Sequence, residues 1–222
     1  MERQQVPNLD GPCFGPKAAG PAQQLVILCH GVGADGHDLI DLAPAWAAAL
    51  PHAAFASPDG PERYDMAPMG RQWFSLADRT PERMDAGVAV AAEALGRFID
   101  AELVRFGLPA DAYALMGFSQ GAMAALYAGL RHNPGPRAIL AYSGALLAPG
   151  RMAEVVGRPP VLLVHGEVDD VVPVERSRIA ERMLRAHGVP VEALYRDRLG
   201  HGLDDVGLSA GALFLQRAFA SA

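Results

Sequence analysis

A serine between two glycines is the residue of this chain best suited to attack a carbonyl carbon. Ser119 lies in the stretch Gly117-Phe118-Ser119-Gln120-Gly121, which fits the pattern G-x-S-x-G. In that pattern the glycines let a strand and a helix approach closely, and the serine is exposed on a strained turn between them. A serine hydroxyl is a weak nucleophile until a base accepts its proton. The pattern therefore predicts a nucleophile that needs a histidine beside it.

We predict that this base is His201, one of seven histidines in the chain. It lies in the glycine-rich stretch Leu199-Gly200-His201-Gly202, between the last expected strand and the last expected helix. A loop in that place can carry an imidazole over the edge of a sheet. His30 and His165 each lie between an apolar run and a glycine, and we expect both to be turn residues that pack beside the site.

A buried carboxylate would complete the site, because it fixes the tautomer of the histidine and stabilises the imidazolium. Asp169 and Asp170 both follow a buried strand, and we favour Asp169. Asp204 and Asp205 lie closer to His201 in the sequence, but we expect Asp205 to cap the last helix. The serine, the aspartate and the histidine then occur in the chain order that the G-x-S-x-G turn predicts.

Acyl transfer also needs donors for the negative oxygen that develops on the substrate, usually two backbone amides. The amide after the nucleophile belongs to Gln120, at the start of a helix whose dipole favours negative charge. The second donor is expected in the turn His30-Gly31-Val32-Gly33, which follows the first buried strand. Val32 is the predicted donor in that turn.

The elements that must position these residues alternate between apolar runs and helical patterns. Continuous apolar runs indicate strands buried on both faces, which are typical of a parallel sheet covered by helices, and such sheets place their sites at the carboxyl ends of the strands. The expected strands are residues 25–29, 53–56, 113–116, 138–142, 161–164 and 191–195, and the expected helices are residues 36–50, 85–107, 122–127, 174–187 and 205–220. This order predicts a mostly parallel α/β sheet.

One long segment, residues 57–83, has no clean period and contains four prolines. Loops of this length are uncommon in compact domains unless they have a function. Its apolar residues, among them Met69, Trp73 and Phe74, suit either a wall of the substrate site or a small core under the loop. We also consider residues 57–80 as a partial lid.

Length and composition restrict the class of protein. A chain of 222 residues suits one domain, which we expect over residues 24–222 after an irregular lead-in over residues 1–23 with at most a short edge strand. A net charge of −6 gives no attraction to nucleic acid. Cys13 and Cys29 have no metal-ligand spacing, and no run of apolar residues suits a signal or a spanning helix. We therefore expect a cytoplasmic protein with no metal, no cofactor and no stable membrane insertion.

Several stretches together resemble the phospholipase/carboxylesterase family of small α/β-hydrolases, which includes the acyl-protein thioesterases. The matching stretches are Leu28-Cys29-His30-Gly31-Val32-Gly33-Ala34-Asp35-Gly36, Gly70-Arg71-Gln72-Trp73-Phe74, Gly117-Phe118-Ser119-Gln120-Gly121-Ala122, His165-Gly166-Glu167-Val168-Asp169-Asp170-Val171-Val172-Pro173 and Gly200-His201. They run from about residue 24 to the end of the chain. Cys29 departs from the family, where many members carry an apolar or aromatic residue, and this puts no catalytic residue in doubt.

The resemblance implies the α/β-hydrolase fold, with the acid at Asp169 and the oxyanion donors at Val32 and Gln120. It also implies that Trp73 and Phe74 border an acyl pocket, to which we add Met69 and Leu146 as further substrate-binding residues. Some relatives form dimers, so the resemblance allows a homodimer. The segment of residues 144–160 is too short to hold a separate cap domain, which favours an open, shallow site.

The predicted function is that of a serine carboxylesterase, which acts on small-molecule esters or acyl chains through an acyl-enzyme. Lysophospholipids and acyl thioesters are further substrates consistent with the resemblance. The alternatives are an acyl-protein thioesterase, a dienelactone-hydrolase-like enzyme and a non-catalytic binding protein on a hydrolase scaffold. Residues 31–36 also fit the nucleotide-binding pattern G-x-G-x-x-G, but no suitable acidic residue ends the second strand, so we discount that function.

Overall fold

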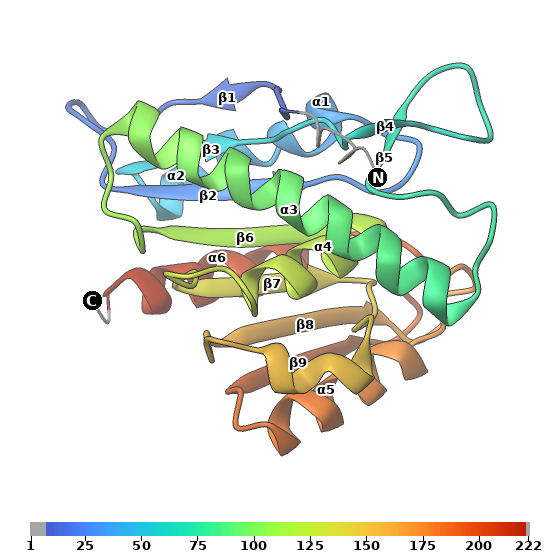
Figure 1. Ribbon diagram of the computed structural model, residues 1–222. Helices are drawn as coiled ribbons and strands as arrows, with labels where there is room; N and C mark the ends of the chain where they lie inside the picture. Colours follow the sequence, from blue (N-terminus) through green and yellow to red (C-terminus); the bar gives the residue numbers. More distant parts are fainter. Residues whose placement is uncertain (1–7, 221–222) are drawn as a thin grey trace.

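A seven-stranded sheet forms the centre of the molecule in a computed structural model that describes residues 8–220 (Figure 1). The strand order is β1-β3-β2-β6-β7-β8-β9. Within this sheet, β1 runs antiparallel to its neighbour β3, and all the other neighbouring strands are parallel. The strands are β1 (Cys13–Phe14), β2 (Gln24–Cys29), β3 (Ala53–Ala56), β6 (Tyr113–Phe118), β7 (Ala138–Tyr142), β8 (Val161–Gly166) and β9 (Val191–Arg196). The predicted mostly parallel sheet is confirmed.

Helices cover both faces of the sheet, as the alternating pattern predicted. One face carries α3 (Pro81–Phe106), α4 (Gln120–Gly129) and α5 (Glu175–Ala186). The other face carries α1 (Gly36–Ile40), α2 (Ala43–Ala49) and α6 (Asp205–Ala220). In Figure 1 the first set lies in front of the sheet and α2 and α6 lie behind it.

The central strand β2 explains why the strands consist of unbroken apolar runs. Leu25 and Ile27 belong to the core on the α3 and α4 side, whereas Val26 and Leu28 belong to the core on the α2 and α6 side. All four are fully buried. Successive side chains of a strand point to opposite faces, so a strand covered on both faces must be apolar at every position.

The helix expected over residues 36–50 is wrong, because the structure has two short helices there, α1 and α2. Pro44 lies in the first turn of α2. Proline has no amide hydrogen to donate to the carbonyl four residues earlier, which is that of Ile40, the last residue of α1. The helix expected from residue 85 instead begins at Pro81.

Two segments expected to lack regular structure contain small elements. Within residues 57–80, β4 (Glu62–Arg63) and β5 (Arg71–Gln72) pair as an antiparallel two-stranded sheet. Residues 144–160 contain one short 3-10 helix, η1 (Pro149–Glu154). The main sheet sets the place of the site, because β2, β6, β8 and β9 are parallel and their carboxyl ends share one edge.

Candidate active site

Ser119 lies on a strained turn between β6 and α4. Its backbone angles are φ 54° and ψ −118°, and a residue other than glycine held at positive φ costs roughly 1–3 kcal/mol. A Cβ atom at Gly117 would collide with the carbonyl oxygen of Gly121, and one at Gly121 would collide with the carbonyl oxygen of Cys29. Both flanking positions therefore require glycine for the strand and helix to pack this closely.

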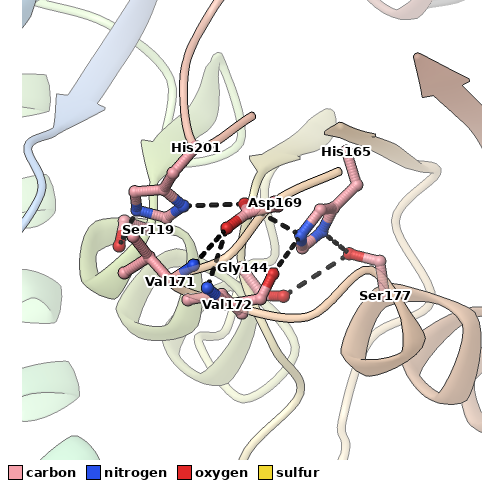
Figure 2. A network of polar contacts seen from close by, with 8 residues as sticks. All are labelled: Ser119, Gly144, His165, Asp169, Val171, Val172, Ser177 and His201. Atoms are coloured by element: carbon pink, nitrogen blue, oxygen red, sulfur yellow. Dashed lines mark hydrogen bonds and ion pairs between the residues drawn. The ribbon is translucent and has the colours of Figure 1, made fainter. Parts of the chain in front are cut away.

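Three side chains from three loops form one continuous chain of hydrogen bonds, shown in Figure 2. The Nε2 atom of His201 lies 2.9 Å from Oγ of Ser119, and its Nδ1 atom lies 2.7 Å from Oδ2 of Asp169. A carboxylate can only accept here, so Nδ1 carries the hydrogen and Nε2 is free to accept the serine proton. The ring of Phe118 packs on the imidazole with its centroid 4.9 Å away.

The carboxylate of Asp169 is buried and held through both oxygens. Its Oδ1 atom accepts the amide hydrogens of Val171 at 2.9 Å and Val172 at 2.8 Å. Burial by itself raises the pKa of Asp169, but the hydrogen bond from His201 and the two amides outweigh burial and lower the pKa below its usual value. The carboxylate is therefore charged at neutral pH and faces the imidazole.

The other candidate aspartates lie elsewhere. Asp170 is exposed, and the chain of hydrogen bonds runs through Asp169. The expectation that Asp205 caps the last helix is wrong, because Oδ1 of Asp204 accepts the amide hydrogen of Gly207 at 2.7 Å. Asp205 is instead the first residue of α6, one position too late for its side chain to serve as the N-cap.

Two backbone amides next to Ser119 have no acceptor within residues 8–220. The amide of Gln120 is at the first position of α4, and the first amides of a helix have no preceding helical turn whose carbonyl could accept their hydrogen. The amide of Val32 makes no hydrogen bond among the described residues. A Cβ atom at Gly31 would lie 3.6 Å from Cβ of Ser119, so the turn that contains Val32 passes directly beside the serine.

The imidazole of His30, which is completely buried, holds the turn that contains Val32. Its Nε2 atom accepts the amide hydrogen of Gly60 at 2.8 Å, so its Nδ1 atom carries the hydrogen that bonds the carbonyl of Gly31 at 2.7 Å. Burial lowers the pKa of His30, which favours this neutral form. The Nε1 atom of Trp73 donates to the carbonyl of His30 at 2.9 Å.

Sequence reasoning missed the role of the Gln120 side chain. Its Oε1 atom accepts the amide hydrogen of Trp73 at 2.8 Å, and its Nε2 atom donates to the carbonyl of Phe74 at 2.7 Å. The side chain is buried and ties the long loop to the start of α4. Its position beside the nucleophile was the available signal, but the type of residue alone did not identify its partner.

The four predicted substrate-binding residues lie in different environments. Trp73 and Phe74 are each 1% exposed and belong to the core, whereas Met69 is 79% exposed. Leu146 is partly buried and packs against the same core. Thus Trp73 and Phe74 lie behind the site and contact it through their backbone and through the indole of Trp73. Their role in binding substrate stays a prediction.

Residues 8–220 contain no cluster of three or more His, Cys, Asp or Glu side chains that could hold a metal ion. No helix in the described part of the chain is long and apolar enough to cross a membrane.

Comparison with known proteins matches residues 16–218 to the model of the phospholipase/carboxylesterase family. The chain is 32% identical over 191 residues to esterase YpfH of Escherichia coli, covering 83% of this chain and 78% of that protein. It is also 32% identical over 169 residues to acyl-protein thioesterase 1 of Schizosaccharomyces pombe, covering 72% and 74%.

Among solved structures, that of esterase PE8 superimposes with a TM-score of 0.89 at 38% identity, covering 95% of this chain and 99% of that one. The similarity therefore includes almost the whole described chain, and every loop that contributes to the site lies within it.

Proposed function

The chain belongs to the phospholipase/carboxylesterase family of α/β-hydrolases and is a carboxylic ester hydrolase, and we propose that it works as a serine esterase through an acyl-enzyme on Ser119. The observation that carries this proposal is the unbroken chain from Ser119 through His201 to Asp169, with contacts of 2.9 Å and 2.7 Å. Each member is within the distance at which a proton can be transferred or held.

In the first half of the reaction, the Oγ atom of Ser119 attacks the ester carbonyl while its proton moves to Nε2 of His201. The charged carboxylate of Asp169 keeps Nδ1 protonated and stabilises the imidazolium as it forms. His201 then gives its proton to the leaving alcohol as the carbon–oxygen bond breaks. In the second half, water attacks the acyl-enzyme by the same route and the acid is released.

The negative oxygen of each tetrahedral intermediate is stabilised by the amides of Val32 and Gln120. Both donors lack an acceptor among residues 8–220, so they are available to the substrate without breaking an existing bond. Removal of one such donor from a serine hydrolase typically costs roughly 100- to 1,000-fold in kcat. The Gln120 amide also lies at a helix N-terminus, which favours negative charge.

Thioester hydrolysis is a second candidate activity of the same site. It is favoured by the 32% identity to a protein named acyl-protein thioesterase 1. A thiolate is an easier leaving group than an alcohol, so the same serine, histidine and donors suffice. We assign the acyl side of the site to Met69 and Leu146, with Trp73 and Phe74 behind them.

The test compares hydrolysis of a short-chain chromogenic ester by the wild-type protein and by Ser119→Ala. Loss of the nucleophile is expected to lower kcat by roughly 10⁴-fold or more. Equal rates in the two proteins would contradict the mechanism. A parallel assay with an acyl thioester of the same chain length measures which leaving group the site prefers.

A matched control is Ser143→Ala. Ser143 directly follows β7, has a φ of 47° and is buried, and its Oγ atom makes no hydrogen bond within residues 8–220. The same substitution there should leave kcat within about twofold. Labelling by a fluorophosphonate, present with Ser143→Ala and absent with Ser119→Ala, separates an enzyme from a non-catalytic protein on this fold.

A further inference from the structure

A second buried histidine lies against the carboxylate that faces His201. The Nε2 atom of His165 is 3.2 Å from Oδ2 of Asp169, and both side chains are completely buried. The same oxygen receives Nδ1 of His201 at 2.7 Å. Figure 2 shows the two imidazoles on opposite sides of Asp169. One carboxylate oxygen thus lies between two rings, only one of which reaches the serine.

The hydrogen positions on His165 follow from its partners. Its Nε2 atom lies 2.7 Å from the carbonyl oxygen of Val172, which can only accept, so Nε2 carries the hydrogen. Its Nδ1 atom lies 2.6 Å from Oγ of Ser177 and therefore accepts the serine hydrogen in the neutral ring. Burial lowers the pKa of His165, which favours that neutral form. The N–H of His165 is therefore donated to the Val172 carbonyl, and Oδ2 of Asp169 lies 3.2 Å from the same nitrogen.

His165, Val172 and the Asp169 carboxylate form a closed cycle of contacts. Val172 accepts from His165 through its carbonyl and donates through its amide to Oδ1 of Asp169 at 2.8 Å. His165 in turn faces Oδ2. The carboxylate is thereby restrained at both oxygens from one side, and His201 approaches from the other.

Ser177 connects the imidazole of His165 to α5. It is on α5, is 2% exposed, and its hydroxyl also lies 3.4 Å from the carbonyl of Gly144. Because α5 is packed on the sheet and rigid, the hydroxyl of Ser177 can hold the imidazole of His165 in one orientation. The restraint on Asp169 therefore extends from the site to the first turn of α5.

We propose that His165, oriented by Ser177, is a positioning residue that holds the Asp169 carboxylate in the plane of His201 and shares the charge of Oδ2. The role rests on the proposed function, since it acts through the aspartate that stabilises the imidazolium. His165 itself does not reach the serine or the substrate. Its effect should therefore appear in kcat, because the imidazolium forms only on the way to the transition state.

The test compares His165→Leu with His165→Gln. Leucine fills similar space without a donor, whereas the amide nitrogen of glutamine can take the place of Nε2 between the Val172 carbonyl and Asp169. We expect His165→Leu to lower kcat by roughly tenfold, the lower end of the loss found when a residue that orients a metal-bound histidine is removed, with KM changed less than twofold. His165→Gln should recover kcat to within about threefold of the wild type.

The pH profile separates this role from a purely structural one. Asp169 and His201 are the titratable groups that act on His165. Without the polar N–H of His165 beside Oδ2, the charge of that oxygen acts on His201 alone, so the acid limb of kcat/KM should move to higher pH in His165→Leu and return in His165→Gln. Equal kcat in the leucine and glutamine variants, or an unmoved acid limb in both, would overturn the proposal.

Two further proteins keep the test decisive. Ser177→Ala removes only the hydroxyl that orients the ring and should lower kcat by about threefold; an unchanged kcat and acid limb would count against the proposal even if His165→Leu does not fold. His132→Gln is the matched control, because His132 lies beyond the C-terminal end of α4 and bonds Tyr113 and Asp100. It should leave kcat and the acid limb unchanged.

A spectroscopic measurement separates failure of this inference from failure of the proposed function. The proton between Nδ1 of His201 and Asp169 should give a far-downfield NMR resonance that needs no substrate. It should shift in His165→Leu, stay near its wild-type position in His165→Gln, and be unaffected by His132→Gln. If the wild-type protein proved inactive toward esters, the proposed function would fail, while this resonance would still decide whether His165 acts on Asp169.

Discussion

Two turns with the same dipeptide, His30-Gly31 after β2 and His165-Gly166 after β8, support the two sides of the site. Both imidazoles are completely buried. Each ring nitrogen that carries a hydrogen donates to a backbone carbonyl at 2.7 Å, that of Gly31 in one turn and that of Val172 in the other. The local sequence and the burial are thus nearly the same.

Their remaining partners differ. The other nitrogen of His30 accepts from the backbone of Gly60, so this ring joins two stretches of main chain and fixes the turn that carries the Val32 amide. The other nitrogen of His165 faces the Ser177 hydroxyl, and its donor also faces Asp169. The first histidine positions backbone donors and the second positions a side chain, because different segments pack over the two turns.

The largest expected effect tests the acid side of this comparison. Asp169→Asn keeps the shape of the side chain but removes its charge, and its amide can hold the wrong tautomer of His201. We expect kcat to fall by about 10⁴-fold, as in other serine hydrolases with this change. Asp170→Asn is the matched control, because Asp170 is the exposed neighbour, and it should keep kcat within about twofold. A loss below tenfold for Asp169→Asn would remove Asp169 from the mechanism.

The edge of the sheet at which the site lies could be predicted from sequence, because each functional residue lies in a loop that follows a predicted strand. Val32, Ser119, Asp169 and His201 are in four such loops. The partners of buried polar groups could not be predicted in this way. That Asp204 rather than Asp205 caps α6 depends on where the helix begins, and a one-residue change in that boundary reverses the assignment.

A second prediction compares the glycines of the two turns. A Cβ atom at Gly166 would collide with the carbonyl oxygen of Leu199 and lie 2.5 Å from that of Gly200, directly before His201. Gly166→Ala should therefore displace the imidazole and lower kcat by about 100-fold, the scale for a misplacement of about 1 Å. In Gly31→Ala the tight contact is with the ring of Phe118, at 3.1 Å, which can move, whereas Cβ of Ser119 lies at an ordinary contact distance of 3.6 Å.

We therefore expect Gly31→Ala to lower kcat by less than about tenfold. Steady-state kinetics on both variants, with thermal unfolding to verify that each is folded, measures the difference. Equal losses in the two proteins would mean that the loop carrying His201 is not held by its contact with Gly166. A larger loss for Gly31→Ala would place the tighter constraint on the oxyanion side.

Buried aromatic residues were the least predictable part of the site. Trp73 and Phe74 occur in a loop rich in proline, where the sequence suited a substrate wall and a small core equally well. The structure buries both, and the Gln120 side chain explains why, since it bonds the backbone at both positions. The two hydrogen bonds of the Gln120 side chain span 47 and 46 positions of the sequence. No local sequence pattern could therefore indicate them.

A third prediction concerns the stability that both histidines confer. The pKa of each is lowered by burial, so below about pH 6.5 the unfolded chain binds protons that the folded protein does not. The stability that the two neutral histidines contribute is complete above that pH. It is lost as the pH falls toward the lowered pKa values that they have in the folded protein. We expect the free energy of unfolding to decrease from pH 7 to pH 5, by at most about 2 kcal/mol for each histidine.

Urea unfolding at the two pH values measures this dependence in the wild type, His30→Gln and His165→Gln. In each variant the free energy of unfolding should decrease less between pH 7 and pH 5 than in the wild type, because glutamine does not titrate. Asp169 does not interfere, since the pKa of its carboxyl is lowered and its contribution is lost only at more acidic pH. An identical pH dependence in all three proteins would mean that neither ring is held neutral by the fold.

The smallest expected effect tests the support of the His30 turn. Trp73→Phe removes the N–H that donates to the carbonyl of His30 at 2.9 Å, which leaves a buried acceptor without this bond and should cost about 1–3 kcal/mol of unfolding free energy. The ring of His30 keeps its bonds to Gly31 and Gly60, so kcat should fall only about two- to threefold.

The matched control for this change is Trp46→Phe, which alters a tryptophan that is 3% exposed in the core on the other face of the sheet. That substitution should also lower the unfolding free energy but leave kcat unchanged, because Trp46 packs against α6 beside Gly211. If both variants lost the same activity, the effect would come from general loosening of the fold. If only Trp73→Phe lost activity, the indole acts through His30 on the turn that contains Val32.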